Sequence, residues 1–115
     1  MPHSDFAMLR FDEHFTEDNP EETVQFIIEG NPVGPGYLLI QVADVEAARH
    51  RIRINGMELP GVDIAPSSQS DVWTAWMDRI PQGFLRQGTN AVAIHRMGDD
   101  SFHVLNLVVH WRAVD

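Results

Sequence analysis

Apolar and polar residues alternate in several short segments of this chain, and turn-forming residues separate the segments. In residues 50–54, two isoleucines share one parity and two arginines share the other. This period of two is typical of a β-strand that buries one face. Asn55 and Gly56 follow at once, and because both residues tolerate positive φ, the pair predicts a tight hairpin turn. A short return strand over residues 57–59 is then expected.

A second element is predicted after residue 80. Pro81 suits the start of a short helical turn, because the N–H that proline lacks would be unpaired there. Phe84 and Leu85 can then pack on the core, and Gly88 predicts a left-handed cap that ends the turn. Residues 91–94, with the sequence Ala-Val-Ala-Ile, form the next expected strand.

Further strands complete the pattern. They are expected over residues 6–11, 23–28, 37–42, 72–79 and 102–112. The segment 37–42 is apolar on both parities except at Gln41, which predicts a central strand covered on both faces. In the last segment the odd positions 105–111 are apolar, so Trp111 is expected in the core.

The segments between these strands are polar or rich in turn formers. Acidic residues crowd the stretch from Asp12 to Glu22, which predicts a polar connection, and residues 98–100 predict a tight turn. Many short strands separated by turns every ~8–12 residues favour an all-β sandwich. Residues 1–115 are therefore expected to form one domain of about eight strands.

The order of these signals resembles a known family. A strand, the Asn55-Gly56 turn, a loop, a proline-led turn with Leu85 and Gly88, and then Asn90 before a strand resemble the galactose-binding-domain-like jelly rolls. These β-sandwich modules are often attached to glycoside hydrolases. The similarity covers roughly residues 36–112 and implies a jelly-roll fold. The matching residues are turn and packing positions, so the resemblance brings no sugar-binding residue with it.

Composition excludes several kinds of chemistry. The chain has no cysteine, which rules out disulfides, thiolate catalysis and thiolate metal sites. No apolar run approaches the ~20 residues of a membrane span. The first ten residues lack the basic start and apolar core of a signal peptide, so a cytoplasmic location is expected.

Charge is the strongest compositional signal. Aspartate and glutamate number 17 against 8 basic residues, all of them arginine, and the net charge is −9. Such a surface repels nucleic acid and anionic membranes, so neither is an expected partner. Two interpretations stay open: an ordinary acidic protein, or a halophilic cytoplasmic protein whose self-repulsion is screened by molar salt.

No catalytic or metal motif is evident. The six histidines lack the spacing of a metal motif such as H-E-x-x-H, although His95 and His103 are expected to flank one hairpin. Asp99 and Asp100 could bind calcium, but a plain turn is the favoured interpretation. Because no nucleophile motif or phosphate loop is present either, we expect a protein that is not an enzyme and needs no cofactor.

Two tryptophans are the main candidates for binding. Trp73 and Trp76 have opposite parity in one expected strand, so one should pack inside while the other lies at the surface. An exposed indole can stack on a sugar ring, and Asp71 and Arg79, which bracket the strand, could bind hydroxyl groups. The alternative is that both indoles are core or subunit-contact residues. The loop over residues 61–71, rich in Pro, Ser and Asp, is the expected functional segment.

Two classes of function follow. The first is a non-catalytic binding module for a carbohydrate or another polar ligand. The second is a structural or protein-interaction domain, either a homo-oligomer or a partner subunit of an enzyme encoded elsewhere. An exposed aromatic platform would favour the first, and an apolar, flat surface strand would favour the second.

The charge imbalance generates a stability prediction. We expect the melting temperature to rise between dilute buffer and molar KCl, because salt screens the repulsion among the 17 acidic side chains. Calorimetric scans at several KCl concentrations measure this directly. An unchanged melting temperature would contradict the halophilic interpretation.

Overall fold

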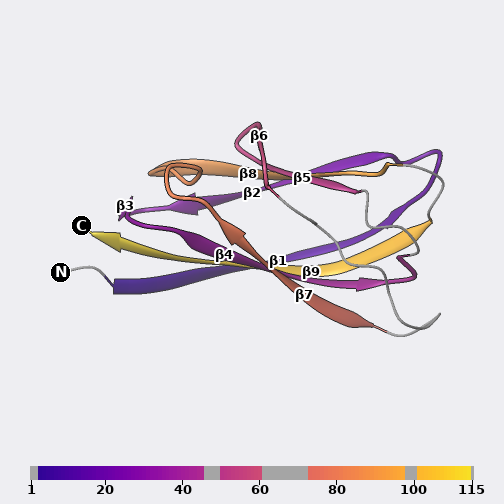
Figure 1. The fold of residues 1–115 in the computed structure, drawn as a ribbon, viewed down its shortest axis with the longest axis horizontal. Helices are drawn as coiled ribbons and strands as arrows, with labels where there is room; N and C mark the ends of the chain where they lie inside the picture. The colour runs from indigo at the N-terminus through magenta and orange to yellow at the C-terminus, as the bar shows by residue number, and fades with distance from the viewer. Residues whose placement is uncertain (1–2, 46–49, 61–72, 98–100, 115) are drawn as a thin grey trace.

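The computed structural model describes residues 3–45, 50–60, 73–97 and 101–114, which form two packed antiparallel sheets (Figure 1). The five-stranded sheet has the order β1-β9-β4-β7, and β3 also pairs with β9. Its strands are β1 (His3–Phe15), β3 (Asn31–Pro32), β4 (Gly36–Ala43), β7 (Thr74–Ile80) and β9 (Phe102–Val114). The four-stranded sheet has the order β2-β8-β5-β6. Its strands are β2 (Glu21–Ile28), β8 (Gly88–His95), β5 (Arg51–Ile54) and β6 (Met57–Glu58).

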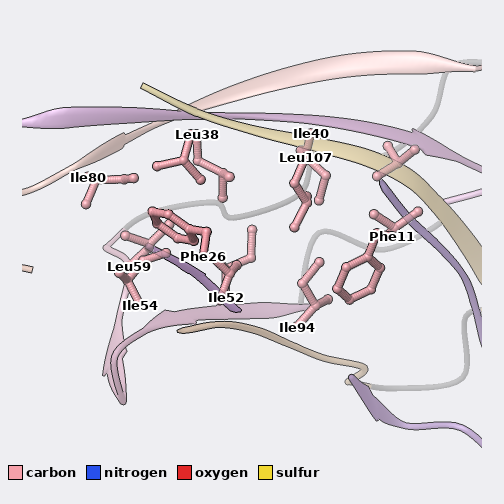
Figure 2. Close-up of a cluster of buried hydrophobic side chains, with 14 of the residues drawn as sticks. Phe11, Phe26, Leu38, Ile40, Ile52, Ile54, Leu59, Ile80, Ile94 and Leu107 are labelled. Atoms are coloured by element: carbon pink, nitrogen blue, oxygen red, sulfur yellow. The ribbon is translucent and has the colours of Figure 1, made fainter. Parts of the chain in front are cut away.

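The all-β sandwich expected from the sequence is confirmed. The described residues contain no helix, and thus none that could cross a membrane. The core lies between the sheets and is built from inward-facing side chains of the longer strands (Figure 2). Leu38 and Ile40 of β4 and Ile52 and Ile54 of β5 are buried in it. Each such side chain removed from water contributes roughly 1.5–3 kcal/mol to the driving force for folding.

The hairpin between β5 and β6 forms as the sequence predicts. Asn55 and Gly56 occupy the two-residue loop with φ of 52° and 82°. The return strand is closed by a hydrogen bond of 2.9 Å from the Leu59 N–H to the Ile52 carbonyl. Open space surrounds the position of a Cβ on Gly56, so glycine is favoured there by its backbone conformation rather than by crowding.

A pair of asparagine amides joins this hairpin to the segment that precedes β8. Asn55 donates from Nδ2 to the Oδ1 of Asn90 and to the carbonyl of Phe84, both at 2.8 Å. Its Oδ1 accepts the backbone N–H of Ala91 at 2.8 Å. Asn90 is fully buried, and its amide group also bonds both the N–H and the carbonyl of Arg86, at 3.0 and 2.8 Å. These bonds satisfy polar groups that burial would otherwise leave unpaired.

The segment before β8 contains the proline-led turn that the sequence predicts, but none of its residues is helical. Phe84 N–H donates to the Pro81 carbonyl at 3.2 Å, which makes a single turn. Gly88 has the expected positive φ, 95°, yet it begins β8 instead of capping a helix. The amides of Asn90 and Asn55 both bond this segment, and local helix signals do not report Asn55, which lies 29 residues from its partner Phe84.

The polar connection expected over residues 12–22 is wrong in its first part. β1 continues through Phe15, and Phe11 and Phe15 are buried. The pairing with β9 shifts between Arg10 and Glu13, and Asp12 adopts a φ of 44° at this bulge. A bulge inserts one residue into a strand, so acidic side chains can stay outside while the strand continues.

Two expectations about which side chains face the core also need correction. In β9, Val104 is buried as well as the odd positions Leu107 and Trp111. The cause is a register shift against β4 near residues 105–106, before which the even positions face the core. β4 is central, but only one of its faces is covered. Tyr37 and Leu39 are 43% and 37% exposed on the other face, because no described element packs over that side of the sheet.

The buried amide pair generates a stability prediction. We expect Asn90→Ala to lower the free energy of unfolding by roughly 2–4 kcal/mol, because it removes the hydrogen bonds of a fully buried amide and leaves partly buried groups of Arg86 and Asn55 without these partners. Chemical denaturation measures the change. The control is Asn31→Ala at an exposed position, which should change stability by less than about 0.5 kcal/mol. Equal effects of the two substitutions would contradict the structural role of the pair.

Candidate functional site

The outer face of the five-stranded sheet carries side chains in cross-strand rows. The register aligns one row as Phe6, His110, Tyr37 and Arg79, and the next as Met8, Val108, Leu39 and Met77. A third row is polar, and contains Arg10, Asn106, Gln41 and Ala75. Asn106 Nδ2 donates to Gln41 Oε1 at 3.2 Å within this row. Most apolar side chains of this face therefore lie in the first two rows, and the third row is mainly polar.

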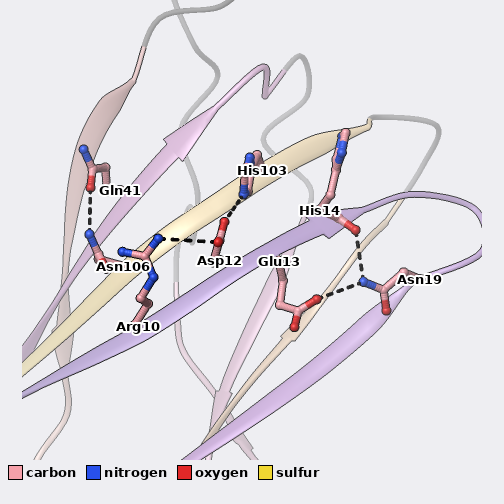
Figure 3. A network of polar contacts seen from close by, with 8 residues as sticks. All are labelled: Arg10, Asp12, Glu13, His14, Asn19, Gln41, His103 and Asn106. Atoms are coloured by element: carbon pink, nitrogen blue, oxygen red, sulfur yellow. Dashed lines mark hydrogen bonds and ion pairs between the residues drawn. The ribbon is translucent and has the colours of Figure 1, made fainter.

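Beyond the polar row, at the bulged end of the sheet, lies a group that we call the indole–imidazole cluster. It consists of Asp12, His14, Trp73 and His103. The His14 and His103 rings stack with centroids 5.6 Å apart, and the Trp73 indole meets His103 edge-on at 5.0 Å. His103 Nε2 lies 2.8 Å from Asp12 Oδ1. Figure 3 shows Asp12, His103 and His14 side by side, together with Arg10, whose Nη2 is 3.5 Å from Asp12 Oδ2.

The cluster is held in place by three strands. His14 and His103 are cross-strand partners on β1 and β9, and Trp73 immediately precedes β7. The bulge in β1 turns Asp12 toward His103, and the hydrogen bond from His103 lowers the pKa of the Asp12 carboxyl below its ordinary value of 3.8. Asp12 is therefore an ionised acceptor at neutral pH, and both Asp12 and the Trp73 indole, which is 41% exposed, contact His103.

The expectation that one of the two indoles packs inside is wrong. Trp76, at 36% exposed, is also at the surface. Trp76 pairs with the buried Ile40, so its side chain lies on the side of β7 that faces the other sheet. Because β7 is the edge strand of its sheet, this indole is not enclosed by the core. Trp111 is buried, as expected.

The other two candidate residues are not gathered around Trp73. Arg79 shares the outer face with Trp73, but it lies six residues along the strand, roughly 20 Å away, and pairs across from Tyr37. Asp71 lies outside the described residues, as do the loop 61–71 and the pair Asp99 and Asp100.

Sequence reasoning missed the imidazoles of the cluster. His95 and His103 do not share a hairpin, because His95 pairs with Glu21 in the four-stranded sheet and His103 pairs with His14 in the other. Within the described ranges, no group of histidine and acidic side chains has the geometry to hold a metal ion. The cluster could have been anticipated only by extending the first strand through His14. That extension brings His14 opposite His103 on the neighbouring strand.

Residues 3–113 match the model of a family described as a family of unknown function, DUF7383. The chain belongs to this family. The sequence matches no curated protein.

Several solved structures have a similar fold at low sequence identity. Dimeric latent PorU from Porphyromonas gingivalis is similar with a TM-score of 0.68 and 13% identity, and the match covers 97% of this chain but 13% of PorU. A family 35 carbohydrate-binding module from Clostridium thermocellum has a TM-score of 0.62 and 17% identity, over 95% of this chain and 97% of the module.

The family 35 module from Paenibacillus barcinonensis has a TM-score of 0.58 and 11% identity, over 95% of this chain and 97% of that one. At such identities the likeness concerns the fold alone. The chain has the jelly-roll sandwich of these modules, as its sequence predicted.

The His103–Asp12 contact generates a titration prediction. We expect the NMR-detected pKa of Asp12 to rise toward 3.8 in His103→Ala, because the hydrogen bond from His103 is the largest cause of the lowered pKa. Arg10→Ala is the comparison and should give a smaller rise. The lowered pKa favours the folded state at neutral pH, and this contribution is lost as the pH falls through the pKa of folded Asp12. An unchanged pKa in His103→Ala would contradict the contact.

Proposed function

We propose that this protein is a non-catalytic module that binds a carbohydrate, or a related polar ligand, at the indole–imidazole cluster. The observation that carries the proposal is the exposed Trp73 indole, which His103 meets edge-on at an open end of the sheet. An indole fixed by a neighbouring ring loses little conformational entropy when a ligand stacks on it.

The chemistry of the cluster suits a sugar. The C–H face of a pyranose can pack on the indole, while polar groups beside it fix the orientation of the hydroxyls. Asp12 can accept hydrogen bonds from hydroxyl groups, and His14, which is exposed, can donate or accept. Arg10 Nη2 lies 3.5 Å from Asp12 Oδ2 and adds a hydrogen-bond donor beside the carboxylate.

The class of the similar structures supports the proposal. Two of them are carbohydrate-binding modules that match over 97% of their own length, so they are similar as whole modules. The cluster also holds a single carboxylate, whereas most glycoside hydrolysis uses two facing carboxylates. A role in binding therefore fits these residues better than a role in catalysis.

A second candidate role is protein interaction. The apolar rows favour it, since Met8 and Met77 are 68% and 61% exposed on the same face.

Glycan-array screening followed by calorimetry tests the carbohydrate proposal. We expect Trp73→Ala to abolish binding of any glycan that the array identifies, and His103→Ala to weaken it about tenfold, because the imidazole positions the indole. The circular dichroism spectrum should stay unchanged, since the Trp73 side chain lies outside the core.

The matched control is Trp76→Ala, which removes an indole of similar exposure from the other side of the same strand. This variant should keep the affinity. The proposal would be overturned if the array gave no hit, or if Trp76→Ala abolished binding while Trp73→Ala kept it.

A further inference from the structure

The first two rows, which we call the apolar rows although they also contain His110 and Arg79, form an exposed band across four strands. Phe6, Met8 and Met77 are 57%, 68% and 61% exposed, and Tyr37 and Leu39 lie between them on β4. Four strands about 4.8 Å apart, and two rows that each occupy two residues of about 3.4 Å along the strand, give a band of roughly 260 Å². Single exposed apolar side chains are normal, whereas apolar side chains gathered in adjacent rows form a patch, and such patches are often functional.

The charge on this face differs from that of the whole chain. The three rows contain no aspartate or glutamate, although the chain has 17 acidic residues and a net charge of −9. They do contain Arg10 and Arg79, and Arg112 lies at the apolar end across from Ser4. Two copies can therefore approach through this face while their acidic residues stay outside the contact, whereas contact through acidic surfaces would be repulsive.

We propose that a second copy of this chain covers the band, with a two-fold axis parallel to the strands between β4 and β9. This axis places β7 of one copy over β1 of the other, and β4 over β9, because the sheet order is β1-β9-β4-β7. The contact is then isologous, with each pair of residues occurring twice.

The register of the rows makes this arrangement self-complementary. Met77 meets the partner's Met8, and Leu39 meets the partner's Val108. In the neighbouring row Arg79 meets the partner's Phe6, which allows a cation–π contact. No arginine of the three rows faces an arginine, since Arg10 lies over the partner's Ala75.

The surface offers room for such packing. A hollow of about 400 Å³ lies at the apolar end of the band, and its lining includes Tyr37, Met77 and His110. An apolar side chain of the second copy can enter it. Facing sheets pack about 10 Å apart with their strands rotated by about 30°, so contact is closest at the centre and opens toward the corners.

The dimer leaves the indole–imidazole cluster at the edge of the contact. Trp73 lies four residues beyond Met77, roughly 13 Å along the strand, and past the bulge that follows Arg10. Both clusters then lie at the same end of the dimer. The proposed dimer does not depend on carbohydrate binding, because it rests on the apolar rows and not on the cluster.

Analytical ultracentrifugation of the whole chain, over a range of protein concentrations in molar KCl, tests the proposal. We expect the parent to form a dimer that dissociates on dilution. Met77→Glu should raise the dissociation constant at least about 100-fold, because it places two carboxylates in the apolar contact. Met77 is 61% exposed, so the variant should still fold, and thermal unfolding checks this.

The direction of the two-fold axis is tested by introducing opposite charges at Met77 and Met8, which meet across the proposed contact. Met8→Arg alone should also weaken the dimer, whereas the double variant Met77→Glu with Met8→Arg should restore it, since each new glutamate meets the partner's new arginine. A two-fold axis perpendicular to the strands would place Met77 on its own counterpart, and the double variant would stay monomeric.

The matched control is Ile27→Glu, which changes a side chain of similar exposure, 67%, on the outer face of the other sheet. This variant should dimerise like the parent. A parent that is monomeric at every concentration, or a Met77→Glu variant that dimerises like the parent, overturns the proposal. A double variant that remains monomeric overturns the assigned axis.

Discussion

The sandwich depends on one buried contact between two asparagine amides. Asn90 is fully buried where β8 begins, and its amide group needs hydrogen-bond partners that the apolar core cannot supply. Asn55 provides one partner because it sits at positive φ in the hairpin turn, 35 residues earlier. The pair therefore links the β5–β6 turn to the segment that precedes β8, and the four-stranded sheet is assembled around it.

This constraint separates the residues that fold the protein from those available for recognition. The amide pair and the core lie within and between the sheets, while the outer face of the five-stranded sheet has no described cover. Along that face, apolar rows give way to a polar row and then to the cluster around Trp73. The acidic residues, which dominate the composition, are absent from the three rows, so a recognition surface can coexist with a net charge of −9.

Much of the fold could be predicted from the sequence, because alternation and turn chemistry are local. The Asn55-Gly56 hairpin and the buried Trp111 follow from them. Alternation does not tell which face is covered, so Tyr37 was expected to be buried although the structure leaves it exposed. Asp12 and His103 are 91 residues apart, and their contact depends on a bulge that has no local signal. The cluster could therefore not be assembled from spacing alone.

The central claim is that recognition takes place on the outer face at Trp73. The three tryptophans are natural probes of this claim, since Trp73 lies on that face, Trp76 on the other side of the edge strand and Trp111 in the core. The direct measurement is the ¹H–¹⁵N spectrum of the three indole N–H groups during titration with a glycan. The account predicts that the Trp73 signal moves to saturation while the Trp111 signal stays fixed. A shift of the Trp76 signal with Trp73 unchanged would contradict it.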